Sequence, residues 1–173
     1  MTHLRVRKIT QTSFFIVLCY LTTTMIKIPS PIAGYIHPGD AAVLLSAFLL
    51  GPGGGAVAAG LGTAMADVLS GYAVYAPGSL IIKALMAMAA GGIIRRAKPG
   101  EKIALTLAKA SVAAEGIMIA GYCLYSAFVL GFGKAALIEI PGNVIQGAFG
   151  GVVSSLLYIA LIKTPYVRAE FNK

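Results

Sequence analysis

The chain has 173 residues, of which 58% are hydrophobic and 12% charged, with a formal net charge of +8 and a mean hydropathy of +0.84. Soluble domains have about 25% charged and about 45–50% apolar residues, so this composition excludes an ordinary soluble globule, a disordered chain and a disulfide-rich mini-protein. It predicts an all-α integral membrane protein. At ~20 residues per span, the length allows about six crossings and leaves little for a soluble domain.

We therefore expect a single six-transmembrane-helix domain, 1–173, with approximate spans at 10–27, 40–51, 55–70, 78–95, 103–130 and 141–163. The first apolar run is too long for a signal peptide and no small-residue cleavage site follows it, so it should be a retained helix. Segment 28–39 is rich in proline and glycine, which predicts an ordered loop. The second span is short for a crossing, which indicates a short or tilted helix.

The positions of the basic residues predict that both termini are cytoplasmic, because basic residues concentrate on that side of a membrane. With six spans, Lys27 and Lys134 fall on the opposite side, and Lys83 and Lys109 lie within spans. The rest of the 14 Lys and Arg fall on the terminal side: Arg5, Arg7, Lys8, Arg95, Arg96, Lys98, Lys102, Lys163, Arg168 and Lys173. The net charge is thus a topology signal, and no nucleic-acid partner is expected.

Charged residues inside apolar spans are costly and point to function. Asp40 could cap the second helix. Asp67 and Lys83 flank a short loop, 71–77, and could form an ion pair. Alternatively, Lys83 donates to a ligand oxygen while Asp67 keeps it charged and oriented.

The last two spans carry further polar groups. Glu115 should face the bundle interior, with Tyr122 two turns further on the same face. Glu139, Asn143 and Gln146 have i, i+4, i+7 spacing and form one polar stripe, which could bind a ligand or pack against another helix through hydrogen bonds.

Most of these groups lie in the outer half of the predicted bundle, which favours an outward-open small-molecule site with aromatic walls, roofed by loops. The makeup suits a flat, polar heterocycle. The predicted substrate-binding residues are Tyr35, His37, Asp40, Asp67, Tyr72, Tyr75, Lys83, Glu115, Tyr122, Glu139, Asn143 and Gln146.

Enzyme motifs are lacking, and we expect no catalytic residues, cofactor or metal. Gly53–Ala58 matches a dinucleotide fingerprint, but no strand precedes it, so close helix packing is the better interpretation. No nucleotide-binding P-loop occurs. Cys19 and Cys123 lie inside apolar runs and read as buried apolar residues.

Several strings resemble the S components of energy-coupling factor (ECF) vitamin transporters: Gly39-Asp-Ala-Ala-Val-Leu-Leu-Ser-Ala-Phe-Leu-Leu-Gly-Pro52, Gly60-Leu-Gly-Thr-Ala-Met-Ala-Asp67, Ser70-Gly-Tyr72, Ala76-Pro77 and Leu80-Ile-Ile-Lys83. The resemblance covers the second to fourth spans well, and the last two only in length and polarity. Within the family the sequence is most similar to the riboflavin, hydroxymethylpyrimidine and pyridoxine group. It lacks a lysine-rich loop associated with riboflavin carriers, which favours a small pyrimidine or pyridine.

The resemblance implies a multi-pass subunit of a prokaryotic cytoplasmic membrane that captures a vitamin under a lid formed by the first outer loop. It also implies partners: a transmembrane coupling subunit and two cytoplasmic ATPases. In the family an A-x-x-x-A face on the first helix docks the coupling subunit, and here Ser13 and Val17 stand at those positions, a departure from the pattern. The alternatives are an S component for riboflavin or another vitamin, a stand-alone facilitator or channel, and an intramembrane enzyme.

Overall fold

The computed structural model describes residues 3–98, 100–165 and 167. Arg168 and Lys173, used in the orientation argument, lie outside these residues. The long elements are all helical: α1 (His3–Met25), α2 (Asp40–Leu69), α3 (Ala76–Arg95), α4 (Ile103–Leu124) and α5 (Ile140–Leu161). A π-helical turn, η1 (Tyr125–Val129), and a 3-10 helix, η2 (Gly133–Glu139), connect α4 to α5. The all-α prediction is confirmed.

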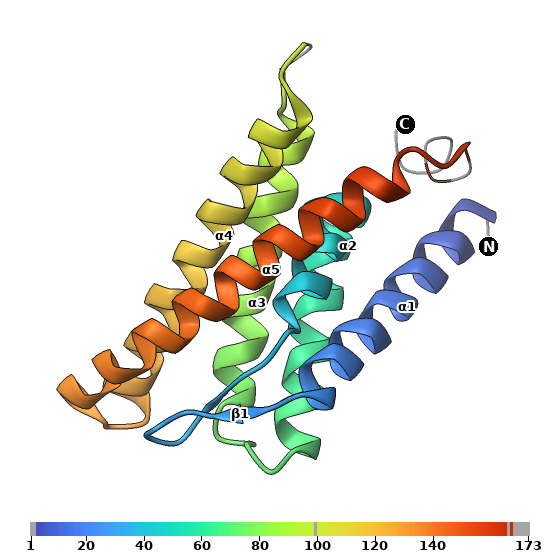
Figure 1. Ribbon diagram of the computed structural model, residues 1–173. Helices are drawn as coiled ribbons and strands as arrows, with labels where there is room; N and C mark the ends of the chain where they lie inside the picture. The colour runs from blue at the N-terminus through green and yellow to red at the C-terminus, as the bar shows by residue number, and fades with distance from the viewer. Residues whose placement is uncertain (1–2, 99, 166, 168–173) are drawn as a thin grey trace.

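Helices α2, α3, α4 and α5 pack in a closed ring, and α1 packs against α2 at the side (Figure 1). The start of α1, the end of α5 and the α3–α4 loop lie at one end of the bundle. At the other end, β1 (Ile28–Pro29) and β2 (Tyr35–Ile36) form a small antiparallel hairpin. The predicted ordered loop at 28–39 is therefore this hairpin, and we call its side of the bundle the hairpin end.

Helix α2 is broken at Gly51, which has φ 76° and ψ −174°. Glycine adopts this positive φ without the steric cost of a Cβ, and Pro52 then occupies the first turn of the second half. The break frees the carbonyl of Leu50, which accepts a hydrogen bond from Arg95 Nη2 at 3.2 Å. The chain folds back at this break, since a Cβ added at Gly55 would lie 2.7 Å from the Cα of Ala47. Helix α2 thus consists of two helical segments joined at Gly51, at the positions expected for the second and third spans.

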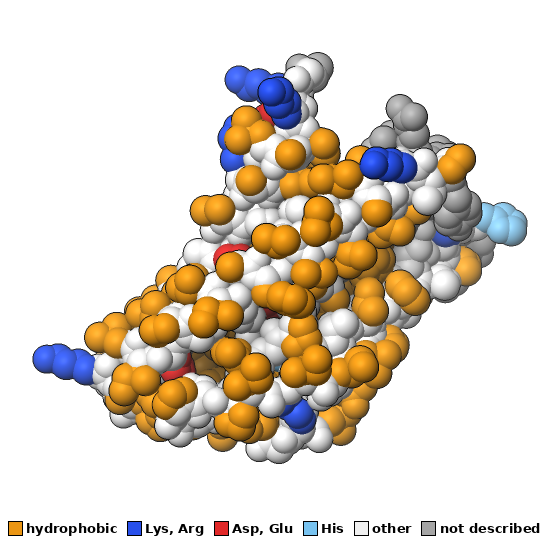
Figure 2. All heavy atoms as spheres, viewed as in Figure 1, with side chains coloured by type: hydrophobic (Ala, Val, Ile, Leu, Met, Phe, Trp, Pro, Cys, Tyr) orange, Lys and Arg blue, Asp and Glu red, His pale blue; other side chains and the backbone are white. Residues whose placement is uncertain are grey.

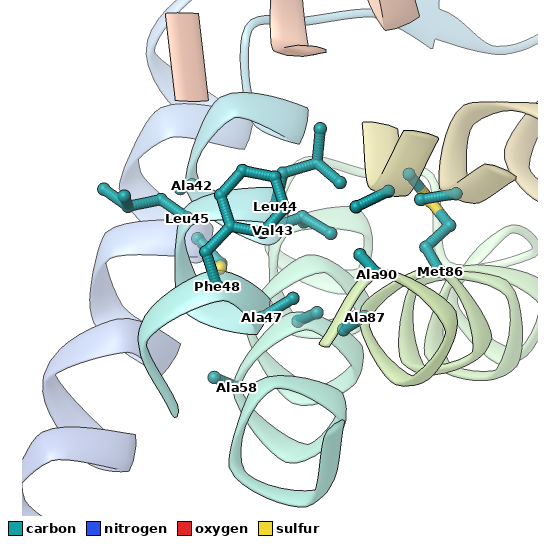
Figure 3. Packing of buried hydrophobic residues seen from close by; sticks show 14 of the residues in the cluster. Ala42, Val43, Leu44, Leu45, Ala47, Phe48, Ala58, Met86, Ala87 and Ala90 are labelled. Atoms are coloured by element: carbon teal, nitrogen blue, oxygen red, sulfur yellow. The ribbon is translucent and has the colours of Figure 1, made fainter. Parts of the chain in front are cut away.

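The first half of α2 is the centre of the bundle. Residues 40–49 are all buried, and their apolar side chains pack with Met86, Ala87 and Ala90 of α3 (Figure 3). At Gly91 an added Cβ would lie 2.6 Å from the nitrogen of Pro52, so α3 crosses α2 directly at the break. The first half is short because the helical conformation is interrupted at Gly51.

Four helical stretches of the described chain are long and apolar enough to cross a membrane: Asp40–Leu69, Ala76–Arg95, Ile103–Val129 and Gly133–Leu161. Exposed apolar side chains cover the middle of the molecule, and the Lys and Arg side chains visible in Figure 2 lie mainly toward its ends. This pattern fits a lipid-facing surface. Crossing number and orientation stay predictions.

Candidate functional site

A cavity of about 250 Å³ lies beneath the hairpin. Its walls come from the hairpin, α2, α3, α4, η2 and the first turns of α5, so it lies at the hairpin end of the bundle, opposite the start of α1 and the end of α5. The lining residues are Pro29, Ser30, Pro31, Gly34, Tyr35, Ile36, His37, Asp67, Tyr75, Ser79, Tyr122, Ile138, Glu139, Pro141, Gly142, Asn143 and Gln146.

Tyr35 ties the hairpin to α2. Its hydroxyl donates to Asp67 Oδ1 at 2.8 Å, and its ring packs on Tyr72 at 4.5 Å between centroids. Burial, and next the carboxylate of Asp67, raise the pKa of Tyr35, so the phenol is a hydrogen-bond donor at neutral pH. The other oxygen of Asp67, Oδ2, is buried and accepts no hydrogen bond from the described residues.

Glu139 is the second carboxylate of the cavity. It stands at the end of η2, directly before α5, and is 7% exposed. Ser126 of η1 donates to its Oε2 at 2.8 Å, and Tyr75 donates to its Oε1 at 3.4 Å. Nearby, the hydroxyls of Ser79 and Tyr122 share a hydrogen bond of 2.6 Å across α3 and α4.

A buried ion pair lies below the cavity. Lys83 Nζ donates to Asp40 Oδ1, and neither side chain is exposed. Gln146 Nε2 donates to Asp40 Oδ2 at 2.8 Å, while Gln146 Oε1 accepts from the backbone N–H of His37 at 2.9 Å. The Gln146 amide thus connects the hairpin to the ion pair.

His37 lies in the segment that connects the hairpin to α2 and stabilises this connection through a hydrogen bond. Its Nδ1 accepts from the N–H of Gly39 at 3.1 Å. Burial lowers the pKa of His37 to about 4, with Asp40 opposing and Lys83 reinforcing this shift. The imidazole is therefore neutral at physiological pH, as an acceptor nitrogen requires.

Glu115 stands apart from the cavity, beside the ion pair. Both carboxyl oxygens are buried without a hydrogen-bond partner among the described residues. Two glycines of α5 leave space for the Glu115 side chain. A Cβ added at Gly147 would lie 2.9 Å from Glu115 Oε2. A Cβ added at Gly150 would lie 3.2 Å from Glu115 Oε1 and 2.7 Å from the Cβ of Asp40.

Eight of the twelve residues predicted for the site line the cavity: Tyr35, His37, Asp67, Tyr75, Tyr122, Glu139, Asn143 and Gln146. The polar stripe of the last helix is among them. Asp40, Tyr72, Lys83 and Glu115 do not line it. Whether any of these residues binds a ligand stays a prediction.

The structure corrects the expectation that Asp67 pairs with Lys83, because Lys83 pairs with Asp40 instead. Lys83 lies one turn below the cavity residue Ser79 on α3, and the central half of α2 brings Asp40 to it. Nor does Asp40 cap its helix: Gly39 is the N-cap, without a side-chain cap bond. Glu115 misses the cavity because it lies seven residues, or about 10 Å, down α4 from Tyr122.

Sequence reasoning missed the serines. Ser30 and Ser79 line the cavity, and Ser126 supports Glu139. Serine is common in membrane helices and loops, so nothing in its spacing marked these positions. The expected docking residues Ser13 and Val17 are both exposed on α1.

These features define a helical membrane protein with a small polar cavity under a hairpin, suited to binding a small solute. The chain belongs to the ECF-type riboflavin transporter S component family, whose model matches residues 3–163. Members are substrate-binding transporter subunits, not enzymes; they bind a vitamin and associate with an ECF module. The predicted family resemblance is confirmed.

The chain is also 31% identical over 144 residues to a Pyrococcus woesei protein described as "Uncharacterized protein in gap 3'region". The alignment covers 83% of this chain and 93% of that protein. Its description assigns no substrate.

Proposed function

We propose that the protein is the substrate-specific S component of an ECF-type importer, and that the cavity beneath the hairpin captures a small vitamin or vitamin precursor. Pyridoxine-like or hydroxymethylpyrimidine-like compounds are favoured. The observation that carries this is the cavity of about 250 Å³, smaller than the about 300–1,000 Å³ of pockets for drug-sized ligands. Riboflavin, a larger ligand, is the alternative substrate.

The chain would cross the membrane six times, with both halves of α2 counted and both termini cytoplasmic. The broken geometry at Gly51 and the basic residues around Arg95 support this topology. The hairpin end then faces outward, where the substrate is captured, and the hairpin serves as the lid. Ser13 and Val17, exposed on α1, would contact a transmembrane coupling subunit that carries the ATPases.

The same cavity suits ligand capture better than free passage, as a stand-alone facilitator would need. The core between the cavity and the other end is filled by buried apolar residues of α2 and α3, such as Leu44, Phe48 and Met86. Uptake would therefore require the coupling module and ATP.

Native mass spectrometry of the purified full chain tests the proposal directly, because a tightly held ligand survives purification. We expect one bound small molecule, lost in Asn143→Ala, which removes an amide from the cavity wall. Val152→Ala is the matched control on the lipid-facing side of the same helix, where Val152 is 60% exposed. Equal ligand occupancy in wild type and Asn143→Ala would refute the assigned site, and uptake without the ATPases would favour a facilitator.

A further inference from the structure

The charged residues that line the cavity are all negative. Two carboxylates line it, Asp67 and Glu139, and no Lys or Arg is among the lining residues. Both are more than nine-tenths buried, at 4% and 7% exposed. Negative charge held in a poorly hydrated wall acts strongly on whatever enters, because little solvent screens it.

The nearest buried cation does not balance these carboxylates. Lys83 Nζ lies 5.3 Å from the ring centroid of Tyr122, a lining residue, but its charge is met by Asp40 in the buried ion pair. Lys27 Nζ lies 5.9 Å from the ring centroid of Tyr35, but Lys27 is exposed and does not line the cavity. The lining of the cavity therefore carries an excess of negative charge.

The two carboxylates differ in the number of hydrogen bonds that their oxygens accept. Glu139 accepts one hydrogen bond on each oxygen, from Tyr75 and Ser126. Asp67 accepts one from Tyr35 on Oδ1, while its buried Oδ2 has no donor in the described chain. A buried acceptor without a donor is unfavourable, and a ligand that supplies one removes that cost.

We propose that the ligand presents a protonated amine, an amidine-like amino group or a similar N–H donor to Asp67 and Glu139. This rests on the proposed function and narrows its substrate class. Among vitamin-like heterocycles, the cavity should prefer those with an amino group. It should bind phosphate esters and carboxylates poorly, because no cation in its wall would pair with their negative charge. It also reverses the sequence-based expectation that Lys83 donates to a ligand oxygen.

Two matched ligand pairs test the charge requirement on the purified, ligand-free full chain. Pyridoxamine and pyridoxine share a ring and differ in one ammonium against one hydroxyl; the amino and oxo forms of hydroxymethylpyrimidine differ in one donor. By calorimetry we expect the aminated member of at least one pair to bind about tenfold tighter or more, because a hydrogen bond from a charged donor to a carboxylate is about twice as strong as one from a neutral donor. The phosphate ester of pyridoxine should bind weakest.

Asp67→Asn keeps the shape of the side chain and removes its charge. It should abolish the preference for the aminated ligand, so that the two members of each pair bind with affinities within about threefold of each other. Glu101→Gln is the matched control, because Glu101 pairs with Lys109 at the opposite end of the bundle. If Asp67→Asn melts well below wild type, Glu139→Gln serves as the second test, with the same expectation.

The outcomes separate this inference from the proposed function. Equal or tighter binding of the hydroxyl, oxo or phosphate members, or a preference that survives both carboxylate variants, would overturn the inference alone. Binding of riboflavin with no binding of either aminated compound would do the same and leave the S-component role standing. No binding of any of these compounds, riboflavin included, would count against both.

Discussion

The ammonium of Lys83 on α3 donates to the carboxylate of Asp40 on α2, and both side chains are fully buried. Lys83 is the largest fully buried side chain of the described chain. The pair joins the first residue of the central half-helix to the neighbouring helix, directly below the cavity. Its position makes it a structural element that supports the site.

Breaking this pair should be costly. Asp40→Asn or Lys83→Met alone leaves one buried charge without its partner, and we expect each to lower stability by about 3–5 kcal/mol. The double variant removes both charges and should lose clearly less than the sum. Thermal melting in detergent measures this coupling; additive losses would mean that the pair is not formed.

Glu115→Gln should behave in the opposite way. The carboxyl oxygens have no hydrogen-bond partner in the described part of the chain, so the amide removes an ionisable group without removing a hydrogen bond. We expect equal or higher melting temperature and unchanged ligand affinity, since Glu115 does not line the cavity. A strong loss of binding would place Glu115 in the site after all.

The close approach of α5 depends on Gly150. An added Cβ would lie 2.7 Å from the Cβ of Asp40, so Gly150→Ala must push the helices apart. We expect a loss of about 1–3 kcal/mol, as for overpacked cores. Gly116→Ala is the control: no atom lies within 4 Å of its added Cβ, and alanine in a helix should be neutral or slightly stabilising.

The hairpin should loosen in acid. The pKa of His37 is about 4, below the ordinary value of 6.5, so the folded state resists a proton that the opened hairpin accepts. Stability contributed by neutral His37 is thus complete above about pH 6.5 and falls as the pH drops toward 4, by no more than about 2 kcal/mol at pH 5.

Ligand affinity and melting temperature, measured at intervals from pH 7.5 to pH 5, check this expectation. His37→Gln, which keeps an acceptor but does not titrate, should flatten the dependence. An unchanged pH profile in His37→Gln would assign the effect to another group.

The sequence by itself predicted the helical membrane class, the family and eight of the residues that line the cavity. Apolar composition leaves few soluble alternatives, and the i, i+4, i+7 spacing of Glu139, Asn143 and Gln146 fixes one helix face without knowledge of the neighbours. The prolines and glycines of 28–39 likewise excluded a helix, and the segment is the hairpin over the cavity.

Only the tertiary structure decided which charges meet. Asp67 and Lys83 are close along the chain, yet the break at Gly51 lets the first half of α2 enter the bundle and present Asp40 to Lys83. The depth of a side chain along a helix axis, which removed Lys83 and Glu115 from the cavity, also depends on how the helices are staggered. Sequence periodicity indicates which residues share a helix face. Which charged residues pair, and how deep a side chain lies in the bundle, depend on where the helices cross, and no local sequence pattern encodes that.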